Sequence, residues 1–457
     1  MLRGSSALAL IILFIFLTGC SSIEDVPEES GKDELPYARI SFYISAGDPE
    51  KALSEYEQAS VKEPESEETR LLYSRLLLLA GRLDEAQAEL DKLVTADPQN
   101  TDAFFNLSLI EGIMGNRTAQ KEFLQKIIGI DNKHAQAHAS LGEISLIDED
   151  YPKAREYFES VLTVDSQNTV ALMGLGNILL REEKNEEALV LFDRILINEP
   201  DFSFGYLDRS KARKALGDTP GALTDITEAI NLDREYYWNY IDRGRLLIEL
   251  RRKDEALVDF NKAVEIDLDY FIAYVYRAGL NYEADKINAA LKDYEKVIDR
   301  KPDYHFAYGH LGGLYFVTDN WKLSAEMFQK AYEYENLEYS FILLKALALK
   351  QGAMEKEARK YLEGMIKELP WESWYYTIAR YLAGAAGEFA VVNAANKEKD
   401  KIIKGQMLFY LGSEFLREGK TVTGLKYLIE ARDINGQEIL ERKIAHWLLL
   451  EDNQQDE

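Results

Sequence analysis

The sequence of 457 residues contains one cysteine, ten prolines and five histidines. A single cysteine cannot form a disulfide within the chain, and it excludes zinc sites built on paired cysteines. Ten prolines and 28 glycines are few for a loop-rich β protein of this length, and the mix of Ala, Leu, Glu, Lys and Tyr favours helices. Basic residues are also scarce, because 54 Lys and Arg stand against 80 Asp and Glu, a net charge of −26. Such an acidic chain repels phosphate backbones, so we expect no nucleic-acid partner.

The sequence also lacks the motifs of the common catalytic chemistries. It has no Gly-x-Ser-x-Gly nucleophile elbow and no Walker-type phosphate loop. His134 and His138 are four residues apart, but Ala135 stands where the zinc-protease motif has its glutamate. We therefore expect no enzyme activity, no cofactor and no metal site.

The first twenty residues have the layout of a secretory signal. Arg3 precedes an apolar run over residues 7–17, and small residues follow this run. The run is shorter than the roughly 20 residues that a membrane-crossing helix needs. The only cysteine, Cys20, follows Leu-Thr-Gly at the expected cleavage point.

This arrangement around Cys20 resembles a bacterial lipobox. The resemblance implies that residues 1–19 are a lipoprotein signal peptide and that the Cys20 thiol carries a diacylglycerol anchor to the lipid bilayer. Residues 20–36 are acidic and indicate a solvated tether. The residue after Cys20 is not Asp, which in enteric bacteria implies the outer membrane, on its periplasmic face or at the cell surface. An ordinary signal peptide with an incidental cysteine and an uncleaved anchor are the alternatives.

The prolines reveal an internal repeat with a period of 34. Five of them share one phase: Pro64, Pro98, Pro200, Pro302 and Pro370. An alanine recurs on the same period from Ala52 to Ala358, and a bulky apolar residue follows it by one helical turn. A small residue recurs on a preceding helix, for example Gly142 and Gly176. We expect this small residue to let the alanine of the second helix approach closely.

The period and its pattern resemble the tetratricopeptide repeat, a helix–turn–helix of about 34 residues. Tyr308-x-x-Leu311-Gly312-x-x-Tyr315 matches the first-helix signature of that family. The resemblance implies an all-α, right-handed superhelical solenoid of antiparallel helix pairs. The expected organisation is about ten repeat units over residues 37–372, a degenerate helical repeat over 373–404, a final repeat-like unit with a capping helix over 405–450 and a disordered tail over 451–457.

Three consecutive repeats carry an arginine that is followed sixteen residues later by an aspartate. The pairs are Arg209 with Asp225, Arg243 with Asp259, and Arg277 with Asp293. This pattern predicts a structural ladder of partly buried ion pairs that fix the register of first and second helices. The alternative is a charged stripe that binds a ligand.

Aromatic and basic side chains recur at positions that tend to face the groove in this repeat family. The candidates for partner binding are Phe204, Lys211, Trp238, Arg245, Tyr282, Phe306 and Phe316. Aromatic and cationic anchors of this kind could hold a peptide. Packing between repeats is the alternative interpretation. A further set of aromatic residues recurs with the same period, namely Phe202, Tyr236, Tyr270 and Tyr304.

The anchor, the open groove and the missing catalytic motifs together predict a non-catalytic scaffold or adaptor in the bacterial cell envelope. Its partners would be other envelope proteins or peptides, and a homodimer is left open. The C-terminal part, with Trp371-x-x-Trp374 and Phe409-Tyr410-Leu411-Gly412, resembles the new lipoprotein I family, which scaffolds peptidoglycan hydrolases and proteases. The alternatives are a surface adhesin or host-ligand binder, and a component of a secretion, pilus or export complex.

Overall fold

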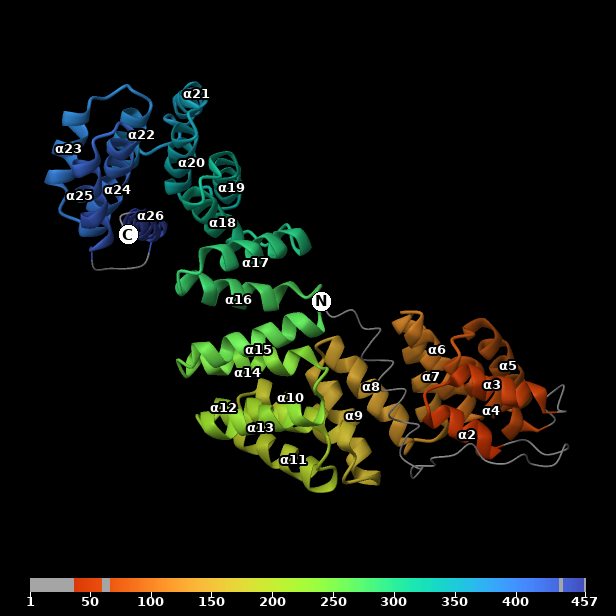
Figure 1. Cartoon of the computed structure of the whole chain (residues 1–457). Coiled ribbons are helices and arrows are strands. Elements are labelled where there is room, and N and C mark those ends of the chain that lie inside the picture. The colour runs from red at the N-terminus through yellow and green to blue at the C-terminus, as the bar shows by residue number, and fades with distance from the viewer. Residues whose placement is uncertain (1–36, 60–65, 435–438, 456–457) are drawn as a thin grey trace. The chain divides into compact units, whose positions relative to one another are not determined.

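The computed structural model describes residues 37–59, 66–434 and 439–455 (Figure 1). The expected signal peptide, Cys20 and the acidic tether lie outside the described residues. The described residues form 25 helices and no strand, which confirms the all-α fold. The chain divides into two compact units, one up to Leu232 and the other from Asp233.

The first unit contains six helix pairs. Its helices are α2 (Tyr37–Ser45), α3 (Pro49–Gln58), α4 (Glu67–Leu79), α5 (Leu83–Ala96), α6 (Thr101–Ile113), α7 (Arg117–Ile130), α8 (Ala135–Ile147), α9 (Tyr151–Val164), α10 (Thr169–Arg181), α11 (Asn185–Asn198), α12 (Ser203–Ala215) and α13 (Thr219–Leu232). Each helix packs on its neighbours in sequence, and buried apolar residues of consecutive pairs form the core. One cluster contains Leu172 and Leu179 from α10 with Ala188, Phe192 and Ile195 from α11.

The second unit contains four more pairs of the same kind and a C-terminal group of five helices. The pairs are α14 (Tyr237–Glu249) with α15 (Lys253–Ile266), α16 (Phe271–Glu283) with α17 (Ile287–Arg300), α18 (Phe306–Val317) with α19 (Trp321–Tyr334), and α20 (Ser340–Gln351) with α21 (Glu355–Met365). The C-terminal group is α22 (Trp374–Leu382), α23 (Glu388–Lys397), α24 (Lys401–Arg417), α25 (Thr421–Arg432) and α26 (Leu440–Gln455). Because α26 continues to Gln455, the expectation of a disordered tail from residue 451 is wrong for residues 451–455.

The turn inside each of the ten pairs uses one residue in the left-handed backbone region. These residues lie 34 apart: Gly47, Gly81, Gly115, Glu149, Glu183, Gly217, Arg251, Asp285, Asp319 and Ala353. A left-handed residue ends the first helix sharply and sends the chain back along it. Only four of the ten are glycines, so the turn is fixed by the repeat as a whole and not by glycine alone.

In four of the first helices the recurring small residue is a glycine that faces a phenylalanine ring of the second helix. A Cβ atom added to Gly142 would lie 2.6 Å from the ring of Phe158, and one added to Gly176 would lie 2.5 Å from Phe192. The same relation holds for Gly244 with Phe260 and for Gly312 with Phe328. Close packing between the two helices therefore explains these glycines, and the phenylalanine that follows the recurring alanine position by one helical turn takes part in it.

Candidate partner-binding surface

The predicted arginines and aspartates contact each other within each of the three repeats. Arg243 donates from Nη2 to Asp259 Oδ1 over 2.7 Å and from Nε to Oδ2 over 2.9 Å. Arg209 and Asp225 form the same two hydrogen bonds, at 2.7 and 3.0 Å, and Arg277 and Asp293 form them at 2.6 and 2.8 Å. All three aspartates are buried. The hydrogen bonds that Arg243 donates to Asp259 raise the pKa of its guanidinium, so this group stays charged.

Two further contacts link these arginines to the preceding repeat. Arg209 donates to Asp193 of α11 over 2.8 Å, and Arg277 donates to Asn261 of α15 over 3.0 Å. Each of the three guanidinium groups also lies over a tyrosine ring of its own helix, as Arg209 lies 5.3 Å from the Tyr206 ring centroid. Arg209 and Arg277 thus each join three helices through donors that a ligand would otherwise use. This geometry favours the structural interpretation over a ligand-binding stripe.

Three of the predicted groove residues, Phe204, Lys211 and Arg245, each contact a side chain that is close in the sequence. Phe204 is half-buried, with its ring centroid 6.0 Å from that of Phe202. Lys211 and Arg245 are exposed, but Lys211 pairs with Asp208 over 2.7 Å and Arg245 pairs with Asp242 over 3.4 Å. The basic groups of Lys211 and Arg245 thus each have an acidic neighbour within the chain, and both side chains remain accessible to solvent.

The aromatic candidates of the second unit fall into three environments. Phe306 is exposed, while Trp238 is half-buried and packs on Tyr270 with a centroid distance of 5.0 Å. Tyr282 is half-buried beneath Trp447, with 4.9 Å between the ring centroids. Phe316 is only 1% exposed, so its assignment to the groove was wrong. Its ring packs edge-on against Trp321 instead.

The C-terminal helix α26 explains why Tyr282 is covered. Asp285, in the turn between α16 and α17, accepts hydrogen bonds from Trp447 Nε1 over 2.7 Å and His446 Nε2 over 3.1 Å, and it pairs with Lys443 over 2.8 Å. A Cβ atom on Gly313 of α18 would lie 2.9 Å from Leu440, so the two helices approach closely. We expected this helix to shield only the last repeat. It also packs on first helices more than a hundred residues earlier in the chain.

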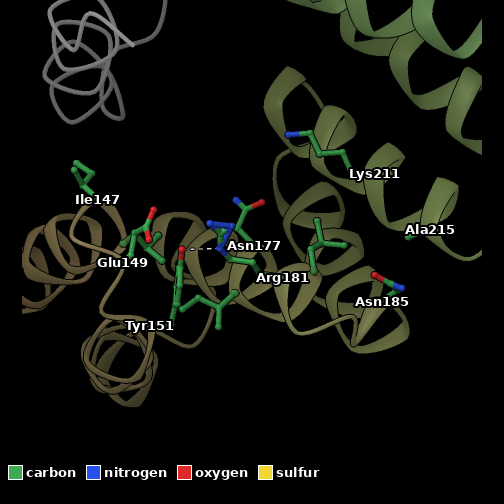
Figure 2. Close-up of a pocket in the computed structure, with 11 residues that line it drawn as sticks. Ile147, Glu149, Tyr151, Asn177, Arg181, Asn185, Lys211 and Ala215 are labelled. Carbon is green, nitrogen blue, oxygen red and sulfur yellow. Dashed lines mark hydrogen bonds between the residues drawn. The ribbon is translucent and has the colours of Figure 1, made fainter. Parts of the chain in front are cut away.

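A cleft of about 610 Å³ lies on the first helices of the first unit (Figure 2). Its size is typical of ligand pockets. It is lined by Leu146, Ile147, Glu149, Tyr151, Asn177, Ile178, Leu180, Arg181, Asn185, Lys211 and Ala215. These residues come mainly from α8, α10 and α12, the first helices of three successive pairs.

The cleft combines apolar side chains with cations and amides. Arg181 donates from Nε to the Tyr151 hydroxyl over 2.5 Å and lies 4.9 Å from that ring's centroid, as Figure 2 shows. Asn177 donates to Asp208 over 3.0 Å, and Asp208 also pairs with Lys211. Neighbouring side chains therefore hold Arg181 and Lys211 in defined positions at the cleft. Such an arrangement can orient a peptide group or a carboxylate.

The sequence predicted only Lys211 among the cleft residues. Asn177 occupies the same repeat position one period earlier, and Arg181 occupies the position of Ala215 one period earlier. Extending the position of Lys211 backward by one repeat period would therefore have found Asn177, whereas Arg181 lies at a repeat position that was not among the predicted groove positions.

Across the described ranges, no group of three or more His, Cys, Asp or Glu side chains is arranged to hold a metal ion. None of the helices within those ranges has the length and the apolar character that crossing a membrane requires.

Comparison with known families decides the nature of the repeat. A tetratricopeptide repeat family profile matches residues 43–107 and 145–206, and a second profile of the same description matches residues 239–270. The chain carries tetratricopeptide repeats. The helix pairs of these TPR units coincide with the 34-residue period of the sequence, and their first helices line the cleft. No curated protein matches the chain.

Solved TPR structures match parts of the chain at low identity. A tetratricopeptide repeat protein from Parabacteroides merdae is 17% identical with a TM-score of 0.41, over 52% of this chain and 94% of its own. A thermophilic TPR protein of Thermus thermophilus is 21% identical with a TM-score of 0.34, over 39% and 98%. YrrB, a TPR protein described as having an unusual peptide-binding site, is 18% identical with a TM-score of 0.33, over 40% and 95%.

Proposed function

We propose that this TPR protein is a membrane-anchored bacterial lipoprotein that acts as a non-catalytic scaffold in the cell envelope. TPR folds generally serve protein–protein interaction. The cleft on α8, α10 and α12 is the observation that carries the binding role, because it presents apolar, amide and cationic groups together. The anchor and the envelope location rest on the sequence around Cys20.

The cleft suits a short extended segment of a partner protein. Its accessible apolar residues, such as Leu146 and Ile147, can contact an apolar side chain, while Arg181 and Lys211 can attract an acidic side chain or a terminal carboxylate. The strong net negative charge elsewhere on the chain would repel most acidic proteins, so only a segment that reaches these cations would bind. Selectivity would then come from the small cationic area within an acidic surface.

Photo-crosslinking in the native envelope tests the binding role. A photoreactive residue in place of Ile147, which is exposed at the cleft, should capture a discrete partner. The same residue in place of Val190, exposed on the second helix α11, is the matched control and should not capture it. Adding Arg181→Ala should reduce the Ile147 product by at least about tenfold, the effect expected for a binding hot spot. Equal capture from both positions would contradict a role for the cleft.

A separate substitution tests the anchor. Changing Cys20 to Ala removes the thiol that would be acylated, so we expect an unprocessed precursor that no longer incorporates a fatty-acid probe. Changing Ser21 to Ala is the control and should leave labelling intact. Continued labelling of the Cys20→Ala chain would show that the lipobox interpretation is wrong. Fatty-acid labelling does not involve the cleft. The proposal of a lipid anchor and the proposal of a binding role can therefore be contradicted independently of each other.

A further inference from the structure

An aromatic stripe crosses the second unit where its first helices begin. We define it as Tyr237, Trp238, Tyr270, Phe271, Tyr304 and Phe306. Consecutive ring centroids lie close together, at 4.8 Å for Tyr237 and Tyr270, 5.6 Å for Phe271 and Tyr304, and 5.7 Å for Tyr304 and Phe306. The stripe therefore runs without a gap across the starts of α14, α16 and α18.

The stripe replaces residues that stabilise helix starts elsewhere in the chain. Asn100, His134 and Asn168 accept a hydrogen bond from the backbone of α6, α8 and α10, and so cap these helices. At the equivalent position, Tyr236 and Tyr270 precede α14 and α16 without a side-chain cap. A capping side chain normally stabilises a helix start. The aromatic residues do not provide this stabilisation of the helix start, and they replace capping residues in consecutive repeats. This replacement points to a role for the rings beyond folding.

The stripe is partly accessible to solvent. Phe306 is 59% exposed, and the other five rings of the stripe are half-buried. Leu268 and Leu337, which lie in turns of the same edge, are also exposed. Contiguous apolar surface of this kind on a folded protein marks an interaction site.

The turns beside the stripe are acidic. Residues 232–236, 266–270, 300–304 and 334–338 together contain seven acidic and three basic side chains. Two of the three basic residues are already paired, Arg300 with Asp269 over 2.9 Å and Lys301 with Asp303 over 2.8 Å. The surroundings therefore repel anions and attract cations. A second copy of a chain with a net charge of −26 would also be repelled.

We propose that the aromatic stripe binds an arginine-bearing segment of a partner protein. A guanidinium group can stack flat on a tyrosine, tryptophan or phenylalanine ring, and the acidic turns supply the attraction that brings it there. The chain already uses this contact internally, because Arg277 lies 5.4 Å from the Tyr274 ring centroid. The stripe and the cleft are separate surfaces, so the partner of one need not be the partner of the other.

Peptide titration tests this proposal. The full chain is titrated by calorimetry at physiological salt with (Arg-Gly-Gly)₄ and with (Lys-Gly-Gly)₄, which carry equal charge. We expect the arginine peptide to bind at least about 5-fold more tightly, because a flat guanidinium stacks on rings better than an ammonium group. Phe306→Ser and Tyr270→Leu should each weaken the arginine peptide about 3- to 10-fold. Phe389→Ser removes a ring that is even more exposed than Phe306 and is not part of the stripe, so this control should change nothing.

Several outcomes would overturn the proposal. Equal affinity for the two peptides, or no effect of either stripe variant, would show that only general acidity attracts the cation. Binding of a neutral oligosaccharide that Phe306→Ser abolishes would assign the stripe to a glycan instead. If Tyr270→Leu unfolds the repeat, the test rests on Phe306→Ser. The Phe306 ring is mostly exposed, so its removal should leave the fold intact. Loss of self-association in the Phe306→Ser chain would assign the stripe to a second copy.

Discussion

Arg243→Leu is expected to lower the free energy of unfolding by about 3–5 kcal/mol. The change leaves the buried carboxylate of Asp259 without the two hydrogen bonds that it now accepts from the arginine. The double change of Arg243 and Asp259 to Leu should recover most of this loss, because it removes the buried charge together with its partner. Urea denaturation and hydrogen exchange of α14 and α15 would measure both effects.

A control for this prediction lies two residues along the same helix. Arg245 is exposed, and its ion pair with Asp242 is long, at 3.4 Å. Arg245→Leu should therefore change the free energy of unfolding by less than about 1 kcal/mol. A double-mutant cycle that finds no coupling between Arg243 and Asp259 would contradict the pairing on which the ladder depends.

Trp447→Ala is expected to cost about 3–5 kcal/mol, the range for removal of a large buried aromatic side chain. Trp447 is among the largest fully buried side chains of the described residues, and its Nε1 donates to Asp285. The variant should release α26 from α18 and expose Tyr282. Hydrogen exchange should therefore increase in α16, α18 and α26 together, although α26 is far from the other two helices in the sequence.

The matched control for Trp447 is Trp371, which is 72% exposed. Trp371→Ala should change stability by less than about 0.5 kcal/mol, because little apolar contact is lost. If Trp447→Ala left hydrogen exchange in α16 and α18 unchanged, the contact with α26 would not contribute to the stability of these helices.

The repeat could be predicted from the sequence because the residues that define it recur within every single repeat. The 34-residue phase of the prolines, alanines and small residues is local information, and so is the spacing of sixteen between Arg243 and Asp259. The contacts from Arg209 to Asp193 and from Arg277 to Asn261 were missed because each joins one repeat to the repeat before it. A pattern read within one repeat does not reveal them.

The groove assignments failed where distant parts of the chain meet. Tyr282 occupies a groove position in its own repeat, and nothing within that repeat indicates that Trp447 covers it. Phe316 was misassigned for a different reason, because its ring turns toward the following helix and packs on Trp321. Lys211 lies at the cleft as a groove residue should, but its pairing with Asp208 was not predicted.

The docking of α26 also bears on the order in which the second unit can fold. TPR helices pack on their neighbours in sequence, so most repeats can form as soon as their own residues are available. Trp447 and Asp285 are 162 residues apart, and contacts across such a separation form slowly because a long loop must close first. Until α26 arrives, Gly313 and the surrounding face of α18 lack their cover. The second unit therefore has an interval during synthesis in which an apolar face is exposed to chaperones and to aggregation.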